Sequence, residues 1–75
     1  MTMKYVMFDE ALPVLFGDYL KHSDIEVRGR EATSAGMVSV CTEGVKCTGH
    51  SLSLNLRPAN GDDQIIENLL KSITL

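Results

Sequence analysis

The middle of the chain alternates between apolar and polar residues, and this pattern constrains the fold more than any other feature. A period of two along Met37–Cys41 is typical of a strand with one buried face. Glu43-Gly44 can form a two-residue turn into a second strand. The predicted pairs are Thr42 with Val45, Cys41 with Lys46, and Val40 with Cys47. This hairpin places four apolar side chains on one face, those of Val38, Val40, Val45 and Cys47.

The predicted register also decides how the two cysteines relate. Cys41 and Cys47 point to opposite faces of the hairpin, so they cannot form a disulfide bond with each other. A three-residue loop centred on Gly44 would place them opposite each other, but it would separate the valines from Cys47. A metal site would need closer cysteine spacing and further ligands. We therefore expect two reduced thiols and neither a metal nor another cofactor.

Farther along the chain, leucines alternate strictly with polar residues. Leu52, Leu54 and Leu56 predict another strand. These positions are even-numbered, whereas the apolar positions of the preceding strand are odd-numbered. One continuous strand would therefore turn the leucines to the opposite face. We expect a bulge or a full turn near Gly49, between the two segments.

The first part of the chain predicts a second hairpin. Tyr5–Phe8 and Leu12–Phe16 are short runs of apolar and aromatic residues, and Asp9-Glu10-Ala11 can connect them. Pro13 cannot donate a backbone hydrogen bond to a neighbouring strand. Its strand is therefore expected at the edge of the sheet or to start at this proline.

Two helices are expected. Ser23 and Glu26 have the spacing of a capping box, which predicts a short helix from about Asp24 to Arg28, closed by Gly29. The C-terminal helix, about a dozen residues long, is predicted by a stripe of apolar residues at helical spacing. The stripe consists of Ile65, Ile66, Leu69, Leu70 and Ile73. Acidic residues in the first turn and a basic residue in the last suit the helix dipole.

Together these elements predict an α+β fold in the order β-β-α-β-β-α. We expect a small antiparallel sheet of about four strands, arranged as two hairpins and packed against the C-terminal amphipathic helix. Residues 1–75 suffice for a single domain. A core of this size supplies only roughly 3–5 kcal/mol of stability, so association into a homodimer is an open alternative.

Charge and hydropathy disfavour two classes of partner. The formal net charge is −3, and the seven basic residues are scattered, which disfavours a nucleic-acid groove. Only Arg28 and Arg30 lie close together in the sequence. The N-terminal segment lacks the apolar core and cleavage site of a signal peptide, and no stretch approaches the ~20 apolar residues of a membrane-spanning helix. We expect a cytoplasmic protein without membrane contact.

Several residues have types used in catalysis, but each has a simpler structural explanation. His22, Ser23 and Asp24 combine a base, a nucleophile and a carboxylate, yet adjacency in sequence does not produce the geometry of a triad. We expect a capped helix start with a partly exposed histidine. Cys47 and His50 would lie on opposite faces of a regular strand, and Cys47 is expected to be a small core residue.

Two acidic pairs have equally simple explanations. Asp9-Glu10 falls in a predicted exposed turn, and Asp62-Asp63 places negative charge at a helix N-terminus. A carboxylate used for acid–base catalysis would need burial to raise its pKa. Glycine-rich phosphate loops are also missing from the sequence. We therefore assign no catalytic, cofactor-binding or metal-binding residue, and an enzyme is disfavoured.

Four segments of the chain carry a resemblance to a known group of proteins. They are Lys4–Phe8, Leu12–Phe16, His22–Ile25 and Ser34–Ser39. In this order they resemble the hairpin with a Pro-Val-hydrophobic-Phe strand, the His-x-Asp-hydrophobic helix start and the Ser-Ala-Gly-led strand of small uncharacterised proteins from tailed bacteriophages and prophages. That group has no known activity. The resemblance implies a phage accessory protein that interacts with other proteins.

Two functions follow as hypotheses. The first is a non-catalytic phage or prophage accessory protein that binds another protein or itself, through strand edges near Pro13 or Leu52–Leu56. The alternative is a small enzyme or ligand-binding domain that uses His22, Cys47 and His50, which requires these side chains to converge on one pocket. Nucleic-acid binding is the least favoured option and would use Lys21, Arg28, Arg30 and Arg57.

Overall fold

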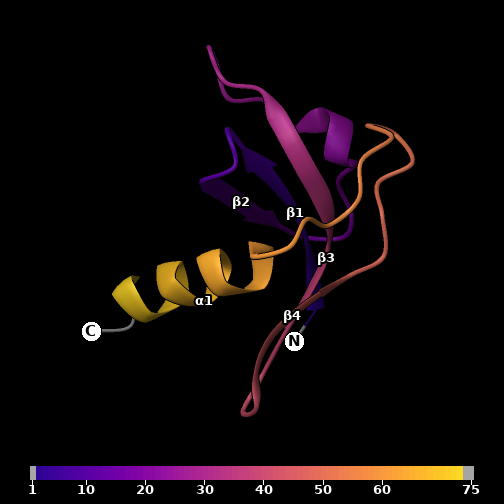
Figure 1. The fold of residues 1–75 in the computed structure, drawn as a ribbon. Coiled ribbons are helices and arrows are strands. Elements are labelled where there is room, and N and C mark those ends of the chain that lie inside the picture. Colours follow the sequence, from indigo (N-terminus) through magenta and orange to yellow (C-terminus); the bar gives the residue numbers. More distant parts are fainter. Residues whose placement is uncertain (1, 74–75) are drawn as a thin grey trace.

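Across residues 2–73, which the computed structural model describes, four strands form one antiparallel sheet in the order β2-β1-β3-β4. The strands are β1 (Thr2–Phe8), β2 (Leu12–Phe16), β3 (Ala32–Cys41) and β4 (Gly44–Thr48). A turn of 3₁₀ helix, η1 (His22–Asp24), follows β2, and helix α1 (Asp62–Ile73) follows a long loop after β4 (Figure 1). The fold is α+β, as predicted, and its sheet is built from two hairpins.

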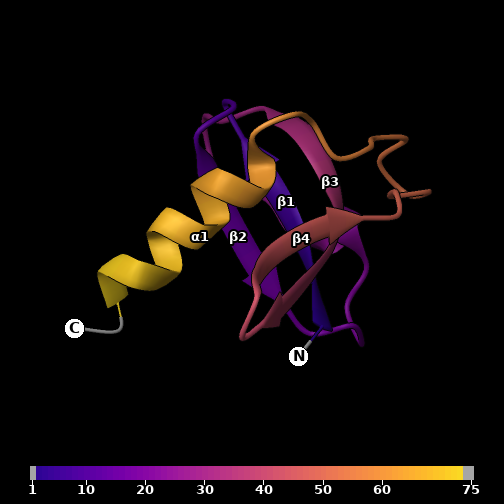
Figure 2. The ribbon, with the colours of Figure 1, turned by 60° about the horizontal axis from the view of Figure 1, so that its bottom comes forward.

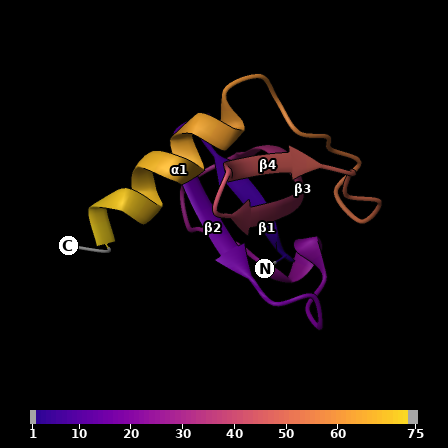
Figure 3. The ribbon, with the colours of Figure 1, turned by 90° about the horizontal axis from the view of Figure 1, so that it is seen from below.

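The sheet has two covered faces, which alternate residues of its strands supply. The helix face is the side that α1 covers, and its buried side chains are Tyr5, Met7, Val38 and Ile66. The loop face is the opposite side, and its buried side chains are Val6, Phe8, Phe16 and Ala35. Figure 3 shows α1 on one side of the sheet and η1 with its flanking loops on the other.

The predicted N-terminal hairpin is confirmed, although β1 begins at Thr2 rather than Tyr5. Asp9 and Glu10 in its turn both have left-handed backbone conformations, with φ of 53° and 61°. A turn of this hand matches the twist of the flanking strands. β2 is an outer strand of the sheet, so Pro13 lies at an edge, as predicted.

The β3–β4 hairpin has the predicted faces but a different turn. Thr42 and Glu43 form the turn, and Gly44 already belongs to β4. The observed pairs are Cys41 with Gly44, Val40 with Val45, Ser39 with Lys46 and Val38 with Cys47. The three predicted pairs are therefore wrong. Both ends of the turn shift by one residue, so each side chain keeps its face and the two cysteines still point to opposite sides.

The predicted strand at Leu52–Leu56 is wrong. The segment forms turns that are closed by the isolated bridge Ser51–Leu56. Asn55 has a left-handed φ of 55°, which an extended strand does not allow. Two of the three leucines pack on the loop face, whereas Leu52 is 86% exposed. The chain bends out of the sheet at Gly49, where β4 has ended, and no bulge forms there.

The predicted short α-helix at residues 24–28 is also wrong, because η1 ends at Asp24. The Asp24 carboxylate accepts the backbone N–H of Lys21 at 3.0 Å and so fixes the single helical turn. Beyond it the chain is extended, and both Ile25 and Val27 pack on the loop face. Side chains two residues apart share a side only in extended backbone, so this packing excludes a helix.

The predicted C-terminal helix is confirmed. Its apolar stripe faces the sheet, with Ile66 completely buried and Ile65 and Leu70 packed around it. Figure 2 shows α1 running obliquely across the sheet, with its C-terminal end extending past the strands. Ile73, in this last turn, is therefore 68% exposed.

Candidate functional site

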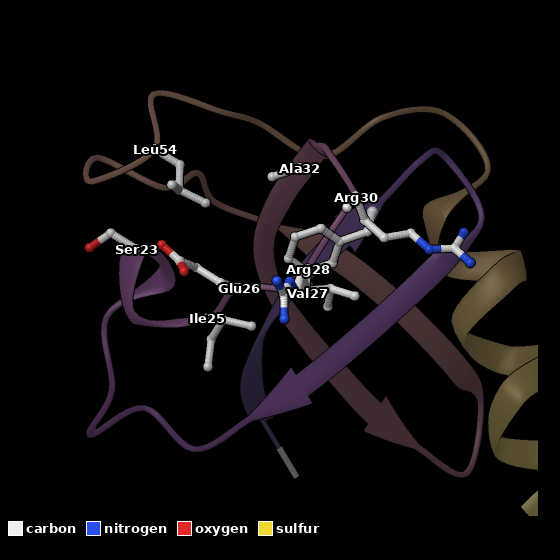
Figure 4. A pocket seen from close by; sticks show the side chains of 10 residues that line it. Ser23, Ile25, Glu26, Val27, Arg28, Arg30, Ala32 and Leu54 are labelled. Atoms are coloured by element: carbon white, nitrogen blue, oxygen red, sulfur yellow. The ribbon is translucent and has the colours of Figure 1, made fainter.

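The arginine pocket is a cavity of about 600 Å³ on the loop face, between two irregular segments. Its apolar wall consists of Phe8, Ile25, Val27, Ala32 and Leu54, and its exposed charged residues are Glu26, Arg28 and Arg30. Figure 4 shows Leu54 on one side of this space, with Ile25 and Val27 on the other.

Local sequence explains both sides of the arginine pocket. The alternation of Ile25 and Val27 in extended backbone turns two apolar side chains towards the sheet. On the other side, the Leu54 N–H donates to the Ser51 hydroxyl at 3.2 Å. Ser51 is buried and bridges to the end of its own turn, so the loop that carries Leu54 is held against the sheet.

The charges around the arginine pocket are of two kinds. The Arg30 guanidinium lies 3.2 Å from the Asp9 carboxylate, and in Figure 4 it points away from the cavity. The other Asp9 oxygen accepts the backbone N–H of Glu31 at 3.1 Å. Arg28 and Glu26, in contrast, have no hydrogen-bond or ion-pair partner within residues 2–73. Arg28 is therefore the cation that this pocket can offer to a ligand.

The basic pocket is a second cavity, of about 280 Å³, next to η1. The titratable side chains that line it are all basic, namely Lys4, Lys21, His22 and His50, and the other lining residues are Met37, Leu52 and Ser53. They come from β1, the start of η1, β3 and the loop after β4. Segments far apart in the sequence thus bring positive charge together in a chain whose net charge is −3.

His22 lines the basic pocket and is buried, whereas the sequence predicted a partly exposed histidine. Only 6% of it is exposed, because its ring lies against Phe16, with 5.5 Å between the ring centroids, and under β3. Its Nε2 lies 2.9 Å from the carbonyl oxygen of Gly36, which can only accept a hydrogen bond. Nε2 therefore carries a proton and donates. Ser23 and Asp24 do not complete a triad, since Asp24 holds the backbone of Lys21.

Of the three residues in the alternative hypothesis, the structure brings together only two. His22 and His50 line the basic pocket, but Cys47 lies on the helix face and packs against the core there. Burial raises the pKa of the Cys47 thiol to about 11, so the thiol stays protonated at neutral pH. A protonated thiol is a poor nucleophile. Cys47 is thus partly buried and packs against the core, where the sequence predicted a small core residue.

Asp62 is the residue whose position sequence reasoning missed. It was expected to be surface charge at a helix N-terminus, but only 3% of it is exposed. One of its carboxylate oxygens accepts hydrogen bonds from the Tyr5 hydroxyl at 2.6 Å, the Ser34 hydroxyl at 2.7 Å and the Ala59 N–H at 2.9 Å. Burial and the bond to Asp62 raise the pKa of Tyr5 well above its ordinary value. Asp62 lies one helical turn before the buried Ile66, and this spacing was the available signal.

Within residues 2–73 no group of three His, Cys, Asp or Glu side chains is placed to hold a metal ion. In the same stretch, no helix has the length and apolar character needed to cross a membrane.

Comparison with known proteins leaves the chain without an assigned family. No family model, no curated protein and no solved structure matches its sequence or its fold. The resemblance to phage and prophage proteins therefore stays a prediction, and functional conclusions depend on the two pockets themselves.

Proposed function

We propose that this chain is a non-catalytic phage or prophage accessory protein of the host cytoplasm, and that it acts by docking a segment of another protein in the arginine pocket. The observation that carries this proposal is an apolar cavity wall beside an arginine that has no partner within residues 2–73. The volume of about 600 Å³ falls in the usual range of binding sites, roughly 300–1,000 Å³.

The chemistry of the walls specifies the kind of segment. The apolar wall fits a large aliphatic or aromatic side chain, and Arg28 can pair with a carboxylate through two parallel hydrogen bonds. Glu26 lies on the same rim and would repel a second acidic residue. The expected segment therefore has one apolar anchor residue and one acidic neighbour.

A protein segment suits this pocket better than a small molecule. Small-molecule sites usually bury roughly 70–90% of the ligand surface. Here Ser23, Glu26, Arg28 and Arg30 are all exposed, so the cavity is open along one side. An open site can take one side chain of a longer segment and leave the rest of that segment in solvent.

Self-pairing through a strand edge has weaker support. Leu52–Leu56 is not a strand, so it offers no edge. β2 contains Pro13 and β4 contains the exposed Lys46, and both residue types discourage the addition of another strand. We therefore favour a different protein over a second copy as the partner, and static light scattering should give the mass of a monomer.

The proposal is tested by selecting binders from a random peptide library displayed on mRNA. We expect the wild-type chain to enrich peptides in which Leu, Ile or Phe lies next to Asp or Glu. Arg28→Glu should weaken the selected peptides by at least about tenfold, the effect of one charge-assisted hydrogen bond. The matched control is Arg57→Glu, because Arg57 is exposed but does not line the pocket.

Two outcomes would contradict the proposal. Selected peptides that bind Arg28→Glu as tightly as wild type would remove the role of the arginine. Amide chemical shifts that change on the helix face, rather than around Ile25 and Leu54, would place the docking site elsewhere. The phage assignment is tested separately by the neighbouring genes, which should encode phage structural, lysis or early proteins.

The alternative, a ligand-binding domain that uses His22 and His50, is supported by one observation. Both imidazoles line the basic pocket together with two lysines. Cys47 lies on the other face of the sheet, so catalysis by all three residues has no support.

A further inference from the structure

The geometry points to a second binding site, and we propose that the basic pocket binds a small phosphomonoester in its dianionic form. This site is separate from the arginine pocket. It is the pocket of the alternative ligand-binding function above, so the proposal rests on that alternative and adds the class of its ligand. The lining residues Lys4, Lys21, His22 and His50 bring cationic and imidazole groups to one cavity of about 280 Å³.

Charge makes the basic pocket unusual for this chain. The sequence has ten acidic and seven basic residues, yet no Asp or Glu lines this cavity. The nearest acidic residue in sequence is Asp24, whose carboxylate already accepts the backbone N–H of Lys21. It forms no ion pair with the Lys21 ammonium group. The positive charge of the pocket is therefore not neutralised from within.

The hydrogen-bond donors of the pocket are partly positioned in advance. The Lys4 Nζ donates to the Leu20 carbonyl at 2.7 Å, which holds the ammonium group in place and leaves its other N–H donors available. His22 is fixed by its bond to the Gly36 carbonyl. Lys21 and His50 are exposed and can adjust to a ligand. A fixed wall with two mobile donor side chains beside it suits a small anion.

The positive charge, the volume and the apolar lining of the basic pocket together indicate which kind of anion it binds. At neutral pH a phosphomonoester carries roughly −1.5 to −2 charges, which matches two ammonium groups. The volume of the cavity lies just below the usual range for small-molecule sites, roughly 300–1,000 Å³, which favours a small phosphomonoester over a nucleotide. Met37 and the largely exposed Leu52 add apolar surface for a small organic substituent.

Titration of the full chain with phenyl phosphate, followed by amide chemical shifts at constant ionic strength, tests this site. We expect saturable shifts confined to the residues around Lys21, His22 and His50. Lys21→Gln should raise the dissociation constant about tenfold, since it replaces a charged donor by a neutral one. His50→Leu should also raise it about tenfold, since it removes a donor to the anion. Lys46→Gln is the matched control, because Lys46 is an exposed lysine outside the pocket, and it should have no effect.

Comparison ligands distinguish the possible sources of binding. Inorganic phosphate should bind less tightly than phenyl phosphate, because it lacks the apolar substituent. Benzenesulfonate should bind at least about tenfold less tightly, because it carries a single negative charge. Equal affinity for either ligand would overturn the assignment to a phosphomonoester.

Three further results would overturn the proposal. One is the lack of saturable shifts at millimolar phenyl phosphate. Another is an equal loss of affinity in Lys46→Gln, which would indicate general screening by surface charge. The last is tighter binding of a single-stranded oligonucleotide than of phenyl phosphate, with a steep salt dependence, because the basic residues would then serve a nucleic-acid surface.

Discussion

The helix face and the loop face of the sheet are built from alternate residues of the same strands, yet they are covered in different ways. On the helix face, Ile66 of α1 closes the core over Tyr5, and one carboxylate oxygen of the buried Asp62 accepts three hydrogen bonds. On the loop face, irregular segments cover the core and leave both the arginine pocket and the basic pocket between them.

The difference teaches how a small chain separates stability from binding. A helix satisfies most of its own backbone hydrogen bonds, so the side chains on its inner face are available for packing. The loops of this chain leave two gaps over the sheet, and Arg28 beside one of them has no ion-pair partner within residues 2–73. We therefore expect substitutions on the helix face to change stability and substitutions on the loop face to change binding. The following predictions test that division, beginning with the largest effect.

Asp62→Ala should be the most destabilising substitution. It would leave the buried Tyr5 and Ser34 hydroxyls without their acceptor, at a cost of roughly 4 kcal/mol. A loss of this size is close to the whole stability of a domain this small, roughly 3–5 kcal/mol. Urea denaturation followed by circular dichroism should show a substantial unfolded fraction even without denaturant.

The neighbouring carboxylate is the matched control for that experiment. Asp63→Ala removes the same charge from the same helical turn, but Asp63 is exposed and bonds only to the N–H of Gln64. It should cost about 0.5 kcal/mol through the helix dipole. Similar losses in the two variants would mean that helix charge, rather than the buried network, is what matters at this position.

Ile66→Ala and Leu54→Ala compare the two faces directly. Ile66 lies on the sheet-facing side of α1 and is completely buried, so its truncation should cost about 3 kcal/mol because a cavity remains. Leu54 is only half-buried, and its truncation should cost about 1 kcal/mol. Equal shifts in the urea midpoints would contradict the view that the helix face dominates stability. Leu54→Ala should also weaken the peptides selected by the arginine pocket.

Gly36→Ala tests the place where β3, β4 and the loop before α1 meet. A methyl group there would lie 2.6 Å from the Thr48 carbonyl oxygen and 2.8 Å from Pro58. The crowding should cost about 2 kcal/mol, because the backbone must shift. In Gly17→Ala the methyl group would meet only the ring of the exposed Tyr19, which can move away, so its melting temperature should hardly change.

Alkaline solution should weaken the helix face. The pKa of Cys47 is raised by burial from its ordinary value near 9.0 to about 11. Between these pH values the unfolded chain loses the thiol proton and the folded chain keeps it, so this contribution to stability is complete below about pH 9 and is lost as the pH rises to about 11. Thermal melting from pH 8 to 11 should show the decline, and Cys47→Ala should make it shallower.

The exposed cysteine controls for general effects of alkali. Cys41 lies on the other face of the hairpin, and Cys41→Ala should leave the pH dependence unchanged. If both alanine variants flatten the curve equally, burial of Cys47 is not the cause. Tyr5 adds its own decline above about pH 10 in both variants, because there the unfolded chain loses the phenolic proton and the folded chain keeps it.

Some parts of the fold were accessible from local pattern. The hairpin turn at Asp9-Glu10-Ala11 and the helix Asp62–Ile73 were predicted, because turn residues and helical periodicity act over a few neighbours. The faces of the β3–β4 hairpin were right even though its pairs were wrong. A shift of the turn by one residue at both ends preserves which side chains meet the core.

Other parts were not accessible. Leu52–Leu56 has the period of a strand, but a strand needs a partner, and β3 offers its hydrogen bonds to β4 and to Arg57 instead. The helix predicted after Ser23 did not form because the core of the loop face needs Ile25 and Val27 on one side. In both places, packing against distant residues outweighed local preference.

The amino-acid sequence by itself determined the α+β class, the two hairpins, the C-terminal helix and the sorting of valines towards one face. These features depend on periodicity, which the chain carries wherever it folds. Only the tertiary structure decided that Asp62 is buried beneath Tyr5 and Ser34, and that Lys4, Lys21, His22 and His50 share a pocket. Such sites join residues far apart in the sequence, and their geometry exists only once the sheet has brought those segments together.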